Sequence, residues 1–217
     1  MGLRIDDVVP NFTALTDEGE ITFHDWIGDS YALLFSHPKD FTPVCTTEFG
    51  AVAQRAAEWE KRGVKVIGLS VDGVEEHKKW KADIETFAGA KPTFPIIADT
   101  DLAVSKALGM LPAEAYLPDG RTAADSATVR ATYLIGPDKK VRFMIIYPMS
   151  VGRNFDEIIR AVDAVQATDK APIATPAGWE PGQEVIIGLG VSDDEAKQKF
   201  GDYKAIFPYL RLTEQPK

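Results

Sequence analysis

The only cysteine in this chain of 217 residues, Cys45, lies within "FSHPKDFTPVCTTEFG", residues 35–50. Pro43 stands just before it, and proline is typical of the first turn of a helix because its missing N–H costs nothing there. The unpaired N–H groups and partial positive charge of a helix N-terminus favour an anion. In such positions thiol pKa values fall to roughly 3.5–7.5. The pattern therefore predicts a reactive thiolate.

Spacing alone leaves two interpretations of Cys45 open. Most lone cysteines are small buried hydrophobic residues, and Cys45 could be one of them. The other interpretation is a nucleophile. A single cysteine allows neither an internal disulfide nor a C-x-x-C motif, so thioredoxin-type disulfide exchange is disfavoured.

The elements around Cys45 predict an α/β layered domain with a mixed central sheet. Continuous apolar runs predict buried strands, and helical spacing of apolar residues predicts helices. The predicted strands are 31–37, 64–71, 94–99, 127–136 and 141–148, and the predicted helices are 46–61, 75–89 and 102–108. The turn "PDKK" joins the last two strands into a hairpin. Cys45 then follows the carboxyl end of a strand, where α/β active sites usually lie.

The composition changes near residue 168. Apolar residues from Phe155 to Val165 predict an amphipathic helix, and a stretch rich in proline and glycine follows it. We therefore expect a main domain at 1–168 and a C-terminal arm at 169–217. About fifty residues are too few to build much core alone, so the arm is expected to lean on the main domain or on another subunit.

Charge and composition exclude several classes of protein. The net charge is -9, with 45% hydrophobic and 26% charged residues, which argues against nucleic acid and against anionic membrane surfaces as partners. We find no apolar segment typical of a signal peptide or a membrane span, and one unpaired cysteine suits the reducing cytoplasm. The three histidines show no metal-ligand spacing, and no phosphate-binding glycine motif occurs, so no metal and no bound cofactor are expected.

Longer motifs resemble a known family. "PKDFTPVC" matches the P-x-x-x-T-x-x-C signature of the peroxiredoxins, which are thiol-dependent peroxidases with a thioredoxin-like fold. The string "SHPKDFTPVCTTE" is similar to their one-cysteine subfamily. The resemblance continues through "VIGLSVD", "FPIIAD", "VRATYLIGPDKKVR", "YPMSVGRNFDEI" and "GWEPGQEVII", and so covers nearly the whole chain.

This resemblance implies four catalytic residues. Cys45 would be the peroxidatic nucleophile, and the Thr42 hydroxyl would hydrogen-bond the peroxide and the thiolate. Pro38 would shield the site from water. Arg130 would stabilise negative charge beside the sulfur, a role that suits arginine because it stays charged.

Four further residues are expected around the substrate. The backbone N–H of Val44 would point at the developing charge, as preorganised donors do in many active sites. The resemblance implies that Arg153 is a second arginine of the pocket, held by Glu48, and that His37 lies next to the pocket. His37 could equally be a packed histidine that ends a strand.

The resemblance also implies substrates and partners. Hydrogen peroxide and organic hydroperoxides would oxidise Cys45 to a sulfenic acid, and an external thiol or other reductant would restore it, since no second cysteine is present. A homodimer, or a larger oligomer built from dimers, would use the C-terminal arm.

Two alternative functions remain open from the sequence. "GDSYA" resembles a G-x-S-x-G lipase motif, which would make Ser30, with His24 and Asp138, a lipid hydrolase site. Ala32 replaces the second glycine, and the motif precedes a strand instead of following one, so a simple turn fits better. The other alternative is a redox sensor or chaperone that uses Cys45 without turnover.

Overall fold

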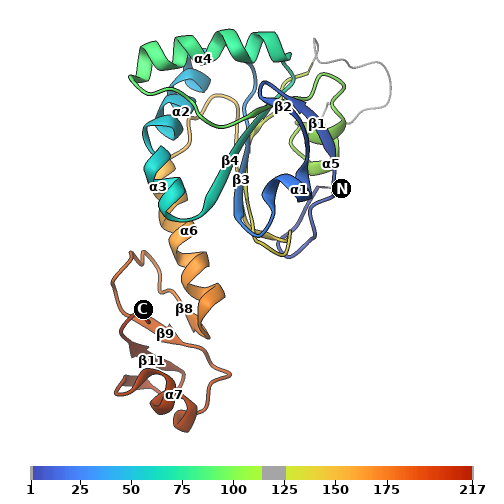
Figure 1. The fold of residues 1–217 in the computed structure, drawn as a ribbon. Coiled ribbons are helices and arrows are strands. Elements are labelled where there is room, and N and C mark those ends of the chain that lie inside the picture. The colour runs from blue at the N-terminus through green and yellow to red at the C-terminus, as the bar shows by residue number, and fades with distance from the viewer. Residues whose placement is uncertain (1, 114–125, 217) are drawn as a thin grey trace. The chain divides into compact units, whose positions relative to one another are not determined.

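The computed structural model describes residues 2–113 and 126–216 (Figure 1). The chain divides into two compact units, Met1–Arg153 and Asn154–Lys217, which we describe separately. Among the helices of the described residues, none combines the length and the apolar character that a membrane crossing requires.

A seven-stranded sheet forms the centre of the first unit. Its strands are β1 (Thr13–Thr16), β2 (Gly19–Thr22), β3 (Tyr31–Ser36), β4 (Val64–Ser70), β5 (Ile96–Ala98), β6 (Arg130–Ile135) and β7 (Val141–Tyr147). The order is β2-β1-β5-β4-β3-β6-β7. Only β3, β4 and β5 pair in parallel, and the other pairs are antiparallel. The predicted mixed sheet and its β6–β7 hairpin are confirmed.

Strand β3 leads into the region of Cys45. Its residues 32–36 are all fully buried, as expected for a continuous apolar run in a sheet covered on both faces. Successive side chains face opposite sides. Leu34 joins a core cluster with Phe23 and Ile27, whereas the Phe35 ring packs at 4.8 Å from the ring of Phe49.

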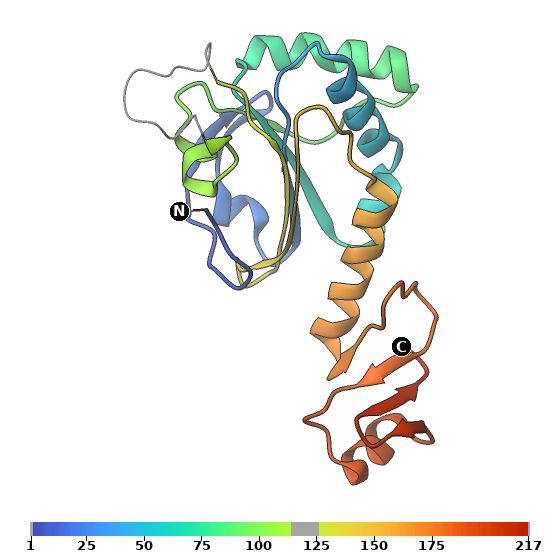
Figure 2. The ribbon, with the colours of Figure 1, turned by 180° about the vertical axis from the view of Figure 1, so that it is seen from behind.

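Helices cover both faces of this sheet. Helices α1 (Phe23–Ile27) and α5 (Ala103–Leu108) lie on one face, and α2 (Pro43–Gln54), α3 (Ala56–Lys61) and α4 (Val74–Ala88) lie on the other, as the view from behind also shows (Figure 2). The predicted helix 46–61 is corrected in two ways. It begins earlier, at Pro43, and it is interrupted at Arg55, so that it forms α2 and α3.

The second unit combines one long helix with a small sheet. Its elements are α6 (Phe155–Lys170), β8 (Ile173–Ala174), β9 (Val185–Ile187), α7 (Asp193–Phe200), β10 (Lys204–Phe207) and β11 (Leu210–Thr213). The four strands are ordered β10-β11-β9-β8. Trp179, only 1% exposed, packs with Ile173 and Val185, and Ala164 and Ala167 of α6 contact this cluster.

The boundary between the two compact units falls before α6, whereas the sequence predicts a boundary after this helix, at residue 168. The reason is that α6 supplies apolar contacts to the segment rich in proline and glycine. That segment therefore buries its tryptophan within its own unit. The division into a main domain at 1–168 and an arm at 169–217 stays a prediction.

Candidate active site

Cys45 lies in the first turn of α2, as predicted. Thr42 is the N-cap, Pro43 opens the helix, and the N–H of Thr46 donates to the Thr42 carbonyl at 3.0 Å. The N–H groups of Val44 and Cys45 belong to this first turn and have no intrahelical acceptor. The cysteine is fully buried. A thiolate at Cys45 would therefore lie close to the positive end of the α2 dipole and be shielded from solvent.

Arg130, the first residue of β6, brings a cation to the sulfur. Its Nη1 lies 3.3 Å from Cys45 Sγ and 2.8 Å from Glu48 Oε2. Its Nε and Nη2 both donate to the carbonyl of Met149. The guanidinium is thus held on two sides while one nitrogen faces the thiol, and only 3% of this residue is exposed.

Arg153 completes the charge cluster from the other side of Glu48. Its Nε and Nη2 donate to the two carboxylate oxygens at 2.9 and 2.7 Å, and its backbone N–H donates to Glu48 Oε1 at 2.8 Å. Burial alone would raise the pKa of Glu48, but hydrogen bonds and charge from Arg153, with the charge of Arg130, hold that pKa below its usual range. Two cations and one carboxylate leave the cluster one positive charge.

The other predicted site residues lie at or just before the N-terminus of α2. Thr42 Oγ1 donates to the carbonyl of Lys39 at 2.8 Å, which leaves the lone pairs of its oxygen to accept a hydrogen bond. Pro38 is buried in the loop that joins β3 to α2, and Val44 is half-buried one residue before the cysteine. Their catalytic roles stay predictions.

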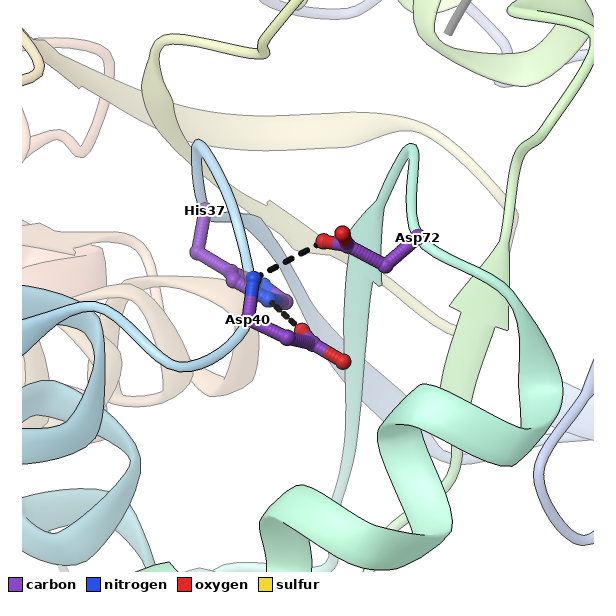
Figure 3. Close-up of side chains that lie close together, drawn as sticks. All are labelled: His37, Asp40 and Asp72. Atoms are coloured by element: carbon purple, nitrogen blue, oxygen red, sulfur yellow. Dashed lines mark hydrogen bonds and ion pairs between the residues drawn. The ribbon is translucent and has the colours of Figure 1, made fainter. Parts of the chain in front are cut away.

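His37 takes part in a buried hydrogen-bond network at the loop between β3 and α2 (Figure 3). Its Nε2 lies 2.7 Å from Asp40 Oδ1, and Nδ1 of His77 lies 2.6 Å from Asp40 Oδ2. The Asp40 backbone N–H donates to Asp72 Oδ2 at 2.8 Å. Asp40, Asp72 and His77 are not among the residues predicted from the sequence. A usable signal existed, because "HPKD" and "DGVEEH" follow two neighbouring parallel strands and so meet at one sheet edge.

This network could also be considered as a metal site, since ligand atoms of His37, Asp40 and Asp72 lie within 4.8 Å of one another. However, the Asp40 carboxylate binds two histidines, and Asp72 Oδ2 accepts from both Asp40 and Ser70. The carboxylate oxygens that could bind an ion already accept these hydrogen bonds, so we describe a hydrogen-bond network. Burial would raise the pKa of Asp40, but hydrogen bonds from both histidines outweigh it and keep that pKa low.

The alternative serine site does not assemble. His24 Nε2 is 2.8 Å from the carbonyl of Val9, and Asp138 pairs with Arg142 at 3.1 Å. Ser30 lies in the turn between α1 and β3, with its backbone N–H on the carbonyl of Ile27. Each group has its own local role, and lipid hydrolysis is not favoured.

The fold and the contact between thiol and arginine together define a class, the thiol peroxidases of thioredoxin-like fold. Two family models match this chain: the AhpC/TSA family over residues 5–144, and the C-terminal domain of 1-Cys peroxiredoxin over residues 164–202. The 1-Cys peroxiredoxin PER1 of Triticum aestivum is 48% identical, over 98% of this chain and 99% of its own length.

Solved structures agree with this likeness. The C45S mutant of the peroxiredoxin 6 of Arenicola marina superposes with a TM-score of 0.92 at 45% identity, over 100% of both chains. A yeast mitochondrial 1-Cys peroxiredoxin, described with a thiol resolving mechanism via glutathione/thioredoxin systems, gives 0.90 at 48% identity over 98% of this chain and 99% of that one. The chain belongs to the AhpC/TSA family, as a 1-Cys peroxiredoxin, and is a thiol-dependent peroxidase.

Proposed function

We propose that Cys45 is the peroxidatic nucleophile, and the observation that carries this is the buried thiol 3.3 Å from the Arg130 guanidinium. The thiolate attacks one peroxide oxygen. A sulfur–oxygen bond forms, the oxygen–oxygen bond breaks, and the leaving hydroxide or alkoxide takes up a proton. The products are a cysteine sulfenic acid and water or an alcohol.

The surrounding residues stabilise the charge that moves during this step. Negative charge passes from the sulfur to the leaving oxygen, and fixed donors along that path are usually the largest contribution to such catalysis. Arg130 and the first-turn N–H groups of Val44 and Cys45 supply donors, and the Thr42 hydroxyl binds the peroxide. Glu48 and Arg153 keep the first arginine in place, and the buried Pro38 limits access of water.

An external reductant completes the cycle. Cys45 is the only cysteine of the chain, so no second thiol of the same chain can trap the sulfenic acid. The yeast relative is described with glutathione/thioredoxin systems, which suggests a small thiol, a thioredoxin or both for this chain as well. Hydrogen peroxide and organic hydroperoxides are the proposed substrates.

Assembly and location complete the proposal. A homodimer would give the C-terminal unit a second surface on which to bury its exposed apolar side chains. The proposed location is the cytoplasm, because one unpaired cysteine suits a compartment that keeps thiols reduced. A yeast relative is mitochondrial, so fractionation of cells that express the protein should test both compartments.

Turnover distinguishes this enzyme from a redox sensor that uses the same cysteine. The purified protein is mixed with a large excess of peroxide over protein, with glutathione alone, with thioredoxin and its reductase, or with no reductant. We expect many equivalents of peroxide to be consumed per protein in at least one reductant series. Without reductant we expect only about one to three, because excess peroxide oxidises the sulfenic acid further to sulfinic and sulfonic acid. No more than this in any reductant series would support the sensor instead.

A further inference from the structure

The loop at residues 37–42, between β3 and α2, is held in a demanding conformation. Phe41, which is 52% exposed, has a backbone φ of 56°, a left-handed value that non-glycine residues seldom adopt. Such a conformation persists only when the surrounding structure holds it. The next residue is Thr42, the N-cap of the helix that carries Cys45. Whatever holds this loop therefore also sets the position of the hydroxyl and the thiol.

Asp40 is the anchor of the loop. Only 4% of this residue is exposed, and its carboxylate lies between two imidazole nitrogens, one of His37 and one of His77. Its backbone N–H is fixed to Asp72, whose carboxylate oxygen also accepts from the Ser70 hydroxyl at 2.8 Å. Side chain and main chain thus tie one loop residue to β4, to the segment that follows it, and to α4.

We propose that His77 is a positioning residue for peroxide reduction: it holds the Asp40 carboxylate, and through it the loop that places Thr42 and Cys45. This inference rests on the proposed function at Cys45 and adds a residue from a different element. His77 lies in the first turn of α4, 37 positions from Asp40 in sequence.

The hydrogen bonds assign the protons in this network. A carboxylate only accepts, so Nε2 of His37 and Nδ1 of His77 must carry protons. Nε2 of His77 lies 3.3 Å from the carbonyl of Ile97. Among the described residues, none hydrogen-bonds Nδ1 of His37. Burial lowers the pKa of His37 against the opposing effect of Asp40, so the neutral ring with its proton toward Asp40 is favoured.

Removing His77 would leave the buried carboxylate with one side-chain donor in place of two. The titratable groups that face Asp40 are His37 from its own loop, Asp72 from the segment after β4, and His77 from α4. Without the His77 hydrogen bond, one of the two side-chain donors that lower the pKa of Asp40 against burial is lost, so that pKa would rise. A partly neutral or displaced Asp40 would release the loop, and a displacement near 1 Å can cost about 100-fold in rate.

Three variants test this proposal, with rapid-mixing measurement of Cys45 oxidation by hydrogen peroxide across a pH series. His77→Leu removes the donor. His77→Asn places an amide N–H near the position of Nδ1, facing Asp40. His77→Gln places it near Nε2, facing Ile97. Lys78→Leu, at the exposed next position of the same helix, is the control.

We expect His77→Leu to oxidise at least about tenfold more slowly than the wild type at neutral pH, with the acidic limb of its rate profile moved to higher pH. His77→Asn and the control should stay near the wild-type rate, and His77→Gln should resemble His77→Leu. If the ring had a purely structural role, the oxidation rate would fall in all three His77 variants, and the acidic limb of the rate profile would stay at the same pH.

Two results would overturn the proposal: a His77→Leu protein with the wild-type rate and profile, or a His77→Asn protein as slow as His77→Gln. If His77→Leu does not fold, the comparison of His77→Asn with His77→Gln still shows whether the hydrogen bond from Nδ1 to Asp40 is the one that matters for the rate. A wild-type protein whose Cys45 does not react with peroxide would instead contradict the proposed function.

Discussion

At the scale of single residues, the candidate site is organised around a buried carboxylate. Glu48 accepts hydrogen bonds from Arg130 and Arg153, and it is only 3% exposed. A buried charge without partners would be very costly, so each member of this cluster needs the others. The consequence for chemistry is that Arg130 faces the sulfur in one fixed orientation.

Replacing the cation should weaken the nucleophile. Arg130→Met keeps an unbranched side chain but removes the positive charge 3.3 Å from Cys45 Sγ. We expect oxidation by hydrogen peroxide to be slower by about 100-fold, the scale found when one catalytic donor is removed. Rapid mixing measures this rate. An equal rate in both proteins would exclude the role given to Arg130.

Glu48 should make stability depend on pH. Its pKa is depressed in the folded protein, so its contribution is present above the ordinary carboxyl pKa and is lost as the pH falls through the folded value. At pH 7 we expect Glu48→Gln to lower the free energy of unfolding by about 3 kcal/mol, with the difference shrinking on acidification.

Urea unfolding of the wild type and Glu48→Gln at several pH values checks this prediction. Glu85→Gln, an exposed position on α4, is the matched control and should behave as the wild type. A Glu48→Gln difference that stayed constant from neutral to acidic pH would show that charge pairing is not its cause.

The chemistry-bearing residues of the site could largely be predicted, but their support could not. Cys45 and Pro43 carry a local signal, since both belong to one helix N-terminus, and Arg130 stands out in an otherwise apolar strand. Asp40 and His77 meet only through the tertiary structure, 37 positions apart. The sequence shows only that both segments follow strands that prove to be parallel neighbours, and it does not identify which side chains pair.

At the scale of elements, the contact between α2 and α4 depends on a small residue. A Cβ atom at Gly50 would lie 2.8 Å from the Cβ of Ala88 and 3.4 Å from the Phe87 ring. Both neighbours belong to the end of α4. Glycine thus permits a close approach of the helix that carries Cys45 to the helix that carries His77.

Gly50→Ala should therefore destabilise the protein, although alanine favours helix formation by about 1 kcal/mol over glycine. Overpacking typically costs about 1–3 kcal/mol, so we expect a net loss near 1 kcal/mol. Thermal unfolding measures it. Gly190→Ala, where a Cβ would meet no atom within 4 Å, is the control. An equal or higher melting temperature for Gly50→Ala would show that the two helices separate at little cost.

Long apolar strands were predictable, and short polar strands were not. β3 and β4 are long and mostly buried, with Lys65 the one exposed residue of β4, so their sequences identify them. The β1–β2 hairpin has only four residues in each strand, partly exposed, and β8 has two residues. Backbone pairing, of β1 with β2 and of β8 with β9, defines these elements, and local propensity does not. The break at Arg55 between α2 and α3 could not be predicted either, because no proline or glycine stands there.

At the scale of the whole molecule, the C-terminal unit exposes an apolar hairpin. Ile206, Phe207 and Tyr209, at or beside the turn between β10 and β11, are 52%, 50% and 65% exposed. The rings of Phe207 and Tyr209 stack at 5.3 Å. Such a group of large side chains favours burial against another protein surface, and the proposed homodimer offers one.

The triple change Ile206→Ser, Phe207→Ser and Tyr209→Ser should weaken the dimer. Burial of one such side chain contributes about 1.5–3 kcal/mol, so a loss of affinity of at least about 100-fold is expected. Sedimentation velocity across a concentration series measures it. Lys199→Ser, exposed on α7, is the control. Equal dimer affinity in both variants would show that the interface does not include this hairpin. A monomeric wild type would show that the proposed dimer does not form.

Reduction of peroxide by Cys45 alone can be tested by single turnover with intact-mass measurement. Reduced wild-type protein and Cys45→Ser are each mixed with one equivalent of hydrogen peroxide, and residual peroxide and protein mass are followed together. We expect the wild type to consume the peroxide and gain one oxygen on Cys45, whereas Cys45→Ser stays folded and consumes none above the buffer rate. Peroxide consumption by Cys45→Ser at a rate close to the wild type would show that another group reduces the peroxide.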